Sequence, residues 1–180
     1  MFPDMRRFKQ EISKDEAIEV LSTCSAGVLA VNGINGYPYT IPLNYTFSDN
    51  RVFIHCATEG YKLDCLRADD RVSFCVIDRN EILPEKFATN YRSVVVFGRV
   101  RFITEDAEKQ KALEAINAKY SPGLEVEGLK EIKRGWNRAI LFAVDVEHMT
   151  GKIDLFTMIE RSREEREASG EECPGKKENN

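Results

Sequence analysis

The stretch Arg51–Arg71, RVFIHCATEGYKLDCLRADDR, changes its periodicity half-way along. Its first residues, Arg51–Cys56, alternate like a strand, with His55 on the opposite face from the aliphatic side chains. Beyond Gly60 the apolar residues recur at helical spacing, as far as about Ala68. The sequence therefore predicts a strand that turns directly into a short helix.

This strand–turn–helix connection has the features of an anion site. The first backbone N–H groups of a helix have no intrahelical partner, and the helix dipole favours a negative charge beside them, most often a phosphate. Lys62 lies in the first turn, where acidic residues are more usual, and a lysine there can add a charge-assisted contact. The alternative is an ordinary connection with a solvated lysine, because such connections are common.

Length and composition predict one globular domain. The chain has 180 residues, of which 42% are hydrophobic and 31% charged, and its formal net charge is −4. This charge argues against a general nucleic-acid binder, which needs a clustered excess of Lys and Arg. No apolar run approaches the roughly 20 residues that span a bilayer, and the N-terminus lacks an apolar signal core. We therefore expect a cytoplasmic protein that does not enter membranes.

The five cysteines, at positions 24, 56, 65, 75 and 173, form no C-x-x-C pair. An odd number in mostly apolar surroundings is typical of reduced thiols in the cytoplasm rather than of a disulfide framework. A zinc site built from His55, Cys56, Cys65 and Cys75 does not match the ordinary zinc-motif spacings, so we predict no metal.

Turn signals and periodicity divide the chain into strands and helices. Strands are predicted at Ser25–Val31, Tyr37–Phe47, Arg51–Cys56, Arg71–Asp78, Tyr91–Ile103 and Arg138–Met149. Helices are predicted at Lys14–Thr23, at Tyr61–Ala68 and from a Thr104 cap to Tyr120, with 124–134 weakly helical or a loop. Ser13 and Glu16 form a capping box before the first helix. Gly98 is expected to mark a bulge or bend in its strand.

The order of these elements predicts a small barrel. Connections between the first four strands are short and of turn type, which favours antiparallel pairing. Pro38 and Pro42 each remove a donor from their strand, so that strand must lie partly at an edge or bend. We predict a mainly β (α+β) fold, a closed or half-open barrel of six strands with helices outside. The domain is placed at residues 1–160, followed by a polar, disordered tail at 161–180.

Three residues stand out as candidates for binding. His55 is either a satisfied histidine on the barrel surface or a residue that lines a pocket. Asn44, in a strand where Asn is disfavoured, either hydrogen-bonds a polar partner or is a plain edge residue. Trp136 either stacks on a ligand or partner subunit or plugs the end of the barrel. His148 is expected to be structural or exposed. No Ser-His-Asp set stands out, so hard chemistry would come from a cofactor.

Together these segments resemble the FMN-binding split-barrel superfamily, in the branch related to pyridoxamine 5′-phosphate oxidase that holds the nitroimidazole-resistance proteins. The resemblance covers about Met5 to Glu160. It rests on PLNY at 42–45, H-x-A-x-x-G-x-K-x-x-x-L at 55–66, YRSVVVFGR at 91–99 and GK at 151–152. The family is built as homodimers with two FMN molecules at the subunit interface. The resemblance therefore implies an antiparallel split β-barrel in a homodimer.

The resemblance also assigns residues to the flavin ring. Carried over by motif, the strand 39–45 lines the isoalloxazine ring, and its polar edge is met by Pro42, Leu43 and Asn44. His55 and Cys56 border the ring and the ribityl chain. In the nitroimidazole-resistance proteins the histidine of this motif is implicated in the active site, so His55 is implied as the catalytic residue on the substrate side.

A second group is implied at the phosphate and at the edges of the pocket. The residues that hold the phosphate are Thr58, Gly60, Tyr61 and Lys62, with Lys62 as the main charge. Ser93 stands where the family places a polar flavin contact, and Trp136 closes the pocket from the partner subunit.

The chain departs from the pyridoxamine phosphate oxidases at two places. Tyr61-Lys62 stands where they have Arg-Lys, and their C-terminal basic residues for the substrate phosphate have no clear match. The resemblance thus implies a flavin-dependent reductase rather than vitamin B6 oxidation, acting on a small electron-poor substrate such as a nitroimidazole or a quinone. Two alternatives stay open: a haem-binding or haem-handling protein, with His55 as a haem contact, and a non-catalytic FMN-binding stress protein.

Overall fold

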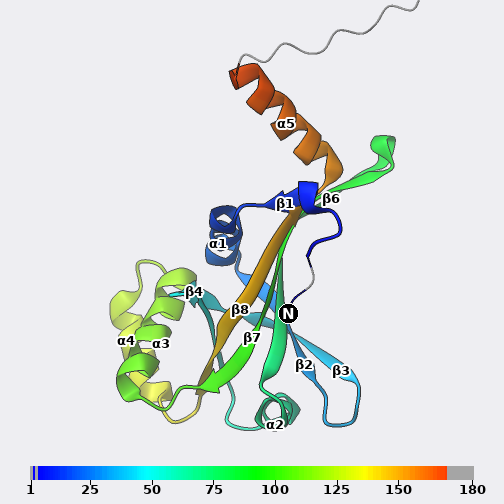
Figure 1. Cartoon of the computed structure of the whole chain (residues 1–180). Coiled ribbons are helices and arrows are strands. Elements are labelled where there is room, and N and C mark those ends of the chain that lie inside the picture. Colours follow the sequence, from blue (N-terminus) through cyan, green and yellow to red (C-terminus); the bar gives the residue numbers. More distant parts are fainter. Residues whose placement is uncertain (1, 3, 170–180) are drawn as a thin grey trace, which may run out of the picture.

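The computed structural model describes residue 2 and residues 4–169, which form one antiparallel sheet with helices around it (Figure 1). The strands are β1 (Glu11–Ile12), β2 (Ala26–Asn32), β3 (Pro38–Asn44), β4 (Thr46–Ser48), β5 (Arg51–Cys56), β6 (Arg71–Leu83), β7 (Ala88–Phe102) and β8 (Ile140–Ile153). The α-helices are α1 (Lys14–Thr23), α2 (Tyr61–Ala68), α3 (Asp106–Tyr120), α4 (Glu125–Gly135) and α5 (Leu155–Ser169). There are also two 3₁₀ turns, η1 (Phe8–Gln10) and η2 (Pro84–Lys86).

The sheet is an open, curled barrel. Its strand order is β3-β2-β6-β7-β8-β5-β4, with β1 beside β8. The two end strands, β3 and β4, are consecutive in the chain and are separated only by Tyr45, so the sheet curls back toward itself without closing. This is the predicted split barrel. It has eight strands in the described residues rather than six, because β4 separates from the predicted Tyr37–Phe47 strand and the short β1 pairs with β8.

Two apolar layers hold the barrel together. The interior cluster includes Val52 and Ile54 of β5 and the fully buried Tyr45. On the opposite face of β5, Phe53 belongs to a second cluster that it shares with residues of α3. His55 follows on that outer face, where it is exposed. The predicted alternation is therefore correct, and both faces of the strand are apolar up to His55.

Most local predictions are confirmed. Helix α1 carries the Ser13–Glu16 capping box, and α2 has its predicted ends. The β7–β8 register shifts at Gly98, where an added Cβ would meet the carbonyl oxygen of Asp145. Only glycine fits this close approach without moving the backbone. The prediction of a Thr104 cap is wrong, because α3 begins one residue later and no side chain caps it.

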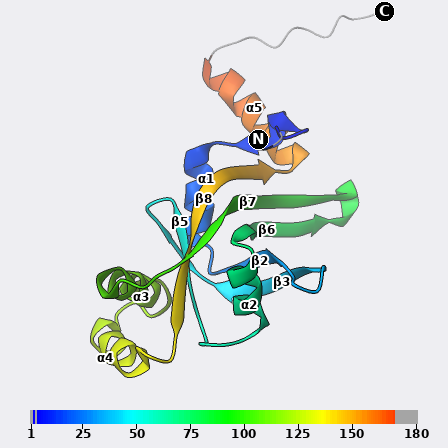
Figure 2. The same ribbon diagram turned by 60° about the horizontal axis from the view of Figure 1, so that its bottom comes forward.

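The structure extends further than the sequence indicates at three places. Strands β6 and β7 continue as an arm that ends at η2 and projects away from the barrel (Figures 1 and 2). Strand β8 continues through 150–153, and its end pairs with β1. The helix α5 follows, so the predicted disordered tail is helical up to Ser169. Residues 170–180 of that tail lie outside the described residues. No helix in the described part is long and apolar enough to cross a membrane.

Candidate functional site

One wall of the candidate site is the outer face of β3. This strand lies at the end of the sheet, as its prolines predict, and its exposed positions include Pro42 and Asn44. The Asn44 side-chain amide donates a hydrogen bond of 2.8 Å to the carbonyl of Ser25. Of the two interpretations of Asn44, the one in which its amide meets a polar partner is therefore correct. The bond ties the end of β3 to the residue that precedes β2.

His55 stands across from this wall. A hollow of about 330 Å³ is lined by Ala26, Pro42, Leu43, Asn44 and His55. It lies where the open sheet curls back on itself, so residues from β3 and β5 share one surface although the two strands are not paired. The structure thus brings four of the predicted site residues together.

The pKa of His55 is lowered first by burial and then by the neighbouring helix α2. Partial burial holds the pKa of His55 below its ordinary value, and the positive charge of Lys62 acts in the same direction. Burial raises the pKa of the Cys56 thiol, against the opposing charges of Lys62 and Arg67. At neutral pH the site therefore presents a neutral imidazole and a neutral thiol near the Lys62 ammonium group.

The beginning of α2 is open to a ligand. Gly60 precedes the helix with φ +132°, a conformation that favours glycine, and no side chain caps the first turn. The backbone amides of Leu63 and Asp64 donate to the Gly60 carbonyl. The amides of Tyr61 and Lys62 come earlier in the helix and have no acceptor within it. Lys62 is half-buried, and no carboxylate of the described residues forms an ion pair with it.

The other residues predicted at this turn differ in their surroundings. Thr58 is exposed in the loop between β5 and α2. Tyr61 packs against Tyr39 of β3, with ring centroids 5.3 Å apart, and its hydroxyl accepts a hydrogen bond from the Asn35 amide. Tyr61 therefore attaches α2 to the β2–β3 hairpin, which is a structural role in this chain.

Trp136 directly follows α4. Its carbonyl accepts a 2.7 Å hydrogen bond from Lys109, whose ammonium group also lies 4.7 Å from the centre of the indole ring. Lys109 reaches the carbonyl of Ala139 as well, at 3.1 Å. Trp136 thus has a cation partner within its own chain, and its contact with a flavin of a partner subunit stays a prediction.

Ser93 is not brought to the other predicted residues within one chain. On β8 it pairs with Lys152, whereas His55 pairs with Leu141. These two positions are separated by roughly 35 Å of strand. Ser93 therefore lies far along β8 from His55, and its contact with a flavin stays a prediction.

The sequence does not single out Tyr120, the last residue of α3. Its hydroxyl accepts a 2.8 Å hydrogen bond from the Tyr45 amide and lies 2.6 Å from the Tyr45 carbonyl. It also lies 2.7 Å from the carbonyl of Ser25, which Asn44 contacts. Tyr120 therefore fixes the corner between β3 and β4. Its partners are backbone groups far away in the sequence, so no local pattern could reveal this role.

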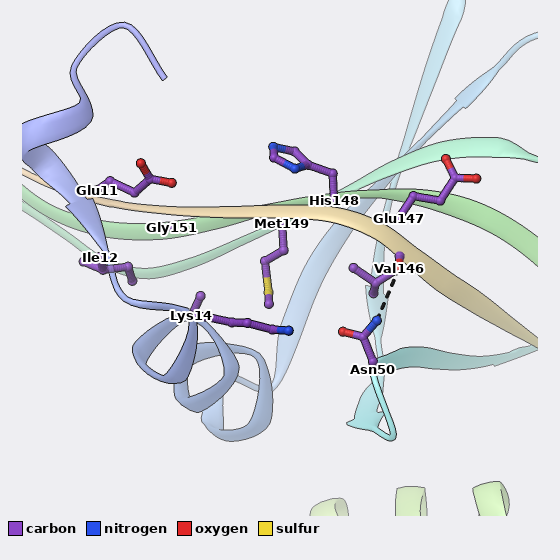
Figure 3. Close-up of a pocket in the computed structure, with 10 residues that line it drawn as sticks. Glu11, Ile12, Lys14, Asn50, Val146, Glu147, His148, Met149 and Gly151 are labelled. Carbon is purple, nitrogen blue, oxygen red and sulfur yellow. Dashed lines mark hydrogen bonds between the residues drawn. The ribbon is translucent and has the colours of Figure 1, made fainter. Parts of the chain in front are cut away.

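A second hollow of about 280 Å³ lies elsewhere, between the start of α1 and β8 (Figure 3). None of the predicted site residues lines it. Lys14 and Met149 lie on one side of the β8 ribbon, while the His148 ring points away from them. That ring stacks on Phe2, with centroids 4.7 Å apart. His148 therefore has a packing role, one of the two that its sequence position predicts.

The described cysteines are free thiols. Cys65 is buried, and Cys24, Cys56 and Cys75 are half-buried. Cys173 lies outside the described residues. Within the part of the chain that the structure describes, no three His, Cys, Asp or Glu side chains gather in a metal-binding group.

The sequence profile of the pyridoxamine 5′-phosphate oxidase family matches residues 13–153, which include strands β2 to β8 and every residue of the candidate site. The chain belongs to this family. No curated protein matches it in sequence.

Solved structures of the same fold extend the comparison. A candidate 5-nitroimidazole antibiotic resistance protein from Bacteroides thetaiotaomicron is 21% identical, with a TM-score of 0.66 over 79% of this chain and 86% of that one. An FAD-binding protein from Mesorhizobium loti is 24% identical, with a TM-score of 0.58 over 80% and 96%. An FAD- and haem-binding protein from Mycobacterium smegmatis is 18% identical, with a TM-score of 0.67 over 84% and 80%. At these identities the likeness establishes the fold, whose solved examples include flavin-binding and haem-binding proteins.

Proposed function

We propose that this protein is an FMN-dependent oxidoreductase that reduces a small electron-poor substrate such as a nitroimidazole or a quinone. The observation that carries the proposal is the convergence of three features at one end of the split barrel. These are the outer rim of β3, the neutral imidazole of His55 and the uncapped start of α2 with its Lys62. Membership of a family built on a flavin-binding fold supports the same assignment.

The residues present fit FMN at both of its ends. Lys62 and the free amides at the start of α2 offer a cation and N–H donors to the phosphate, and Gly60 leaves open space where a side chain would stand. Pro42, Leu43 and Asn44 offer a wall to the ring. When bound, the flavin supplies the hydride or electrons.

His55 is the residue of this chain that faces a substrate in the proposal. Its lowered pKa keeps the imidazole neutral at pH 7, so it can donate one hydrogen bond without adding a charge. A donor at this position can orient a nitro or carbonyl oxygen and stabilise the negative charge that grows there during reduction. The role is one of binding and orientation, and it needs no second titratable group.

The absorption spectrum of the purified protein tests the cofactor. We expect the two visible bands of an oxidised flavin, which bleach on addition of NADH or NADPH and return with a nitroimidazole or quinone. A Soret band without flavin bands would replace the proposal by haem binding, which is named for one structural relative together with FAD. Flavin that no donor and acceptor pair turns over would leave a binding protein and no reductase.

We also propose that the protein is a homodimer through its β6–β7 arm. The ammonium group of Lys86, in η2, lies 5.3 Å from the centre of the Phe156 ring, so the tip of the arm lies beside the start of α5. The arm and α5 carry large apolar side chains that are exposed in the single chain: Ile77, Ile82, Phe87, Leu155, Phe156 and Ile159. Exposed apolar side chains in such number are typical of an interaction surface.

Two residues of the arm support this interface. Phe87, at the tip, is 99% exposed and has φ +48°, a conformation that is costly for a bulky residue. Burial of its ring against a second copy would offset that cost. Ser93 of β7 pairs with the exposed Ile77 of β6, so a partner that covers Ile77 lies close to Ser93. The dimer therefore offers Ser93 a route to the other protomer's flavin.

Phe87→Gly tests this interface without harming the fold. Glycine adopts the positive φ without strain. We therefore expect the monomer's free energy of unfolding to stay unchanged or to rise by up to about 1 kcal/mol. The dimer dissociation constant, measured by analytical ultracentrifugation, should rise about tenfold or more because an aromatic contact is lost. Ile34→Ser removes another exposed apolar side chain, from the β2–β3 turn, and should leave association unchanged. Unchanged association in Phe87→Gly would contradict the proposed interface.

A further inference from the structure

A third hollow, distinct from the one beside β3, lies between α3 and α4, which run side by side at one end of the barrel in both views (Figures 1 and 2). Its volume is about 260 Å³. The apolar walls come from Leu113, Ile116 and Ile132, and the polar groups include Asn117 and Glu131. His55 lines this hollow as well as the one beside β3, so the imidazole is shared by the two.

The hollow is preformed by contacts at both of its ends. A Cβ on Gly128 would overlap the Asn117 side chain, so the two helices touch closely there. At the other end Lys109 of α3 binds the carbonyls of Trp136 and Ala139. Between these ties the space stays open, because a Cβ on Gly135 would meet no atom within 4 Å. The cavity therefore results from how the helices are held rather than from loose packing.

Its chemistry selects a kind of ligand. The volume lies below the range typical of drug-sized molecules and suits on the order of one substituted ring. The imidazole beside the apolar walls is neutral at pH 7. Among the described side chains that line the hollow, the carboxylate of Glu131 carries the charge, and it is paired with Arg134 at 2.7 Å. An anion entering here would lose its hydration against the apolar walls, and none of the described lining side chains is a cation that would compensate it, whereas an uncharged ring would lose far less.

We propose that the α3–α4 hollow is the substrate-binding pocket and that it takes small, uncharged, single-ring aromatic compounds in preference to anionic ones. His55 and Asn117 supply hydrogen bonds that orient the polar substituent of the ring. That the ligand is reduced in this pocket rests on the proposed function, because the pocket places the ligand beside the imidazole that also borders the flavin wall. Binding itself can be measured without any turnover.

Binding is tested by ¹⁹F NMR titration of the full chain with two isosteric probes, neutral 4-fluorobenzamide and anionic 4-fluorobenzoate. We expect the benzamide to bind about tenfold or more tightly than the benzoate. Glu131→Gln keeps the side chain's shape but leaves Arg134 without its carboxylate partner at the edge of the hollow. It should therefore raise benzoate affinity several-fold with little effect on the benzamide. Equal affinity of the two probes for the unaltered protein would overturn the proposed selectivity.

Gly135→Leu tests the location of the pocket. The new side chain starts in open space at the end of α4, where no strained backbone angle requires glycine, so the fold should survive. We expect benzamide affinity to fall about tenfold or more. Ala118→Leu, on an exposed position of α3 outside the hollow, is the matched control and should bind normally. Normal benzamide binding by a folded Gly135→Leu protein would overturn the location.

Flavin absorbance recorded on the same samples separates this inference from the proposed function. If the protein holds flavin and the Gly135→Leu substitution leaves probe binding unchanged, the location of the pocket is refuted and the proposed function is not. Probe binding that depends on Gly135 in a protein that holds no flavin refutes the oxidoreductase and leaves the pocket as a binding site.

Discussion

Lys62→Ala is expected to lose most of its FMN during purification. The ammonium group stands at the uncapped start of α2, is half-buried and has no ion-pair partner among the described carboxylates, so an anion in that position would be its main partner. A charge-assisted hydrogen bond to a phosphate contributes about 1.5–3 kcal/mol, which corresponds to roughly a 10- to 100-fold change in affinity. The measurement is the dissociation constant of FMN, followed by quenching of flavin fluorescence.

Riboflavin is the decisive control for this substitution. It has the same ring and ribityl chain as FMN but no phosphate, so its affinity should be nearly the same for Lys62→Ala and the unaltered protein. Arg67→Ala removes a cation from the other end of α2 and should affect neither ligand strongly, since Arg67 pairs with Asp64 and lies over Phe102. If FMN and riboflavin weaken equally in Lys62→Ala, the lysine supports the fold of the site and does not bind the phosphate.

His55→Ala provides the contrast within the same site. The imidazole lines the hollow beside β3 rather than the start of α2, and it is neutral at pH 7. Its removal therefore takes away contacts with the ring but no charge that an anion needs, so FMN retention should fall less than in Lys62→Ala. A larger loss of flavin in His55→Ala than in Lys62→Ala would reverse the assignment of the two ends of the cofactor.

The parts of this structure that the sequence predicts best are those fixed by neighbouring residues. The Ser13–Glu16 capping box lies within one turn, and the change of period after Gly60 locates both ends of α2. The approach of His55 to the rim at Pro42–Asn44 needs the family resemblance as well, because strand alternation indicates a face but not the neighbour across it.

Two of the missed elements, the β6–β7 arm and the second half of α5, do not show an apolar pattern that would predict them. The β6–β7 arm beyond Asp78 has the sequence Arg79-Asn80-Glu81, without alternation, because these residues lie outside the core. Helix α5 buries no residue and carries an ion pair between Arg163 and Glu167, spaced as helical neighbours. Its polar sequence therefore suggests a disordered tail, whereas the structure has a helix with charge pairs between neighbouring turns.

Tyr120→Phe is expected to cost about 2–4 kcal/mol of folding stability although it removes a single oxygen atom. The hydroxyl accepts from the Tyr45 amide and stands within hydrogen-bond distance of the Tyr45 and Ser25 carbonyls, donating to one of them at a time. Tyr45 is fully buried, so its backbone groups have no easy access to water when the hydroxyl is gone. Each unsatisfied buried group costs about 1–3 kcal/mol. The measurement is the free energy of unfolding in urea.

The same substitution should loosen the site, because Tyr45 joins β3 to β4 and Ser25 also accepts the Asn44 amide. We expect lower stability together with a several-fold weaker affinity for both FMN and riboflavin, which distinguishes the effect from that of Lys62→Ala. Tyr37→Phe is the matched control, since Tyr37 is 74% exposed on the β2–β3 turn and should tolerate the change. Unchanged flavin affinity in a destabilised Tyr120→Phe protein would show that the β3–β4 corner supports the barrel without shaping the cofactor site.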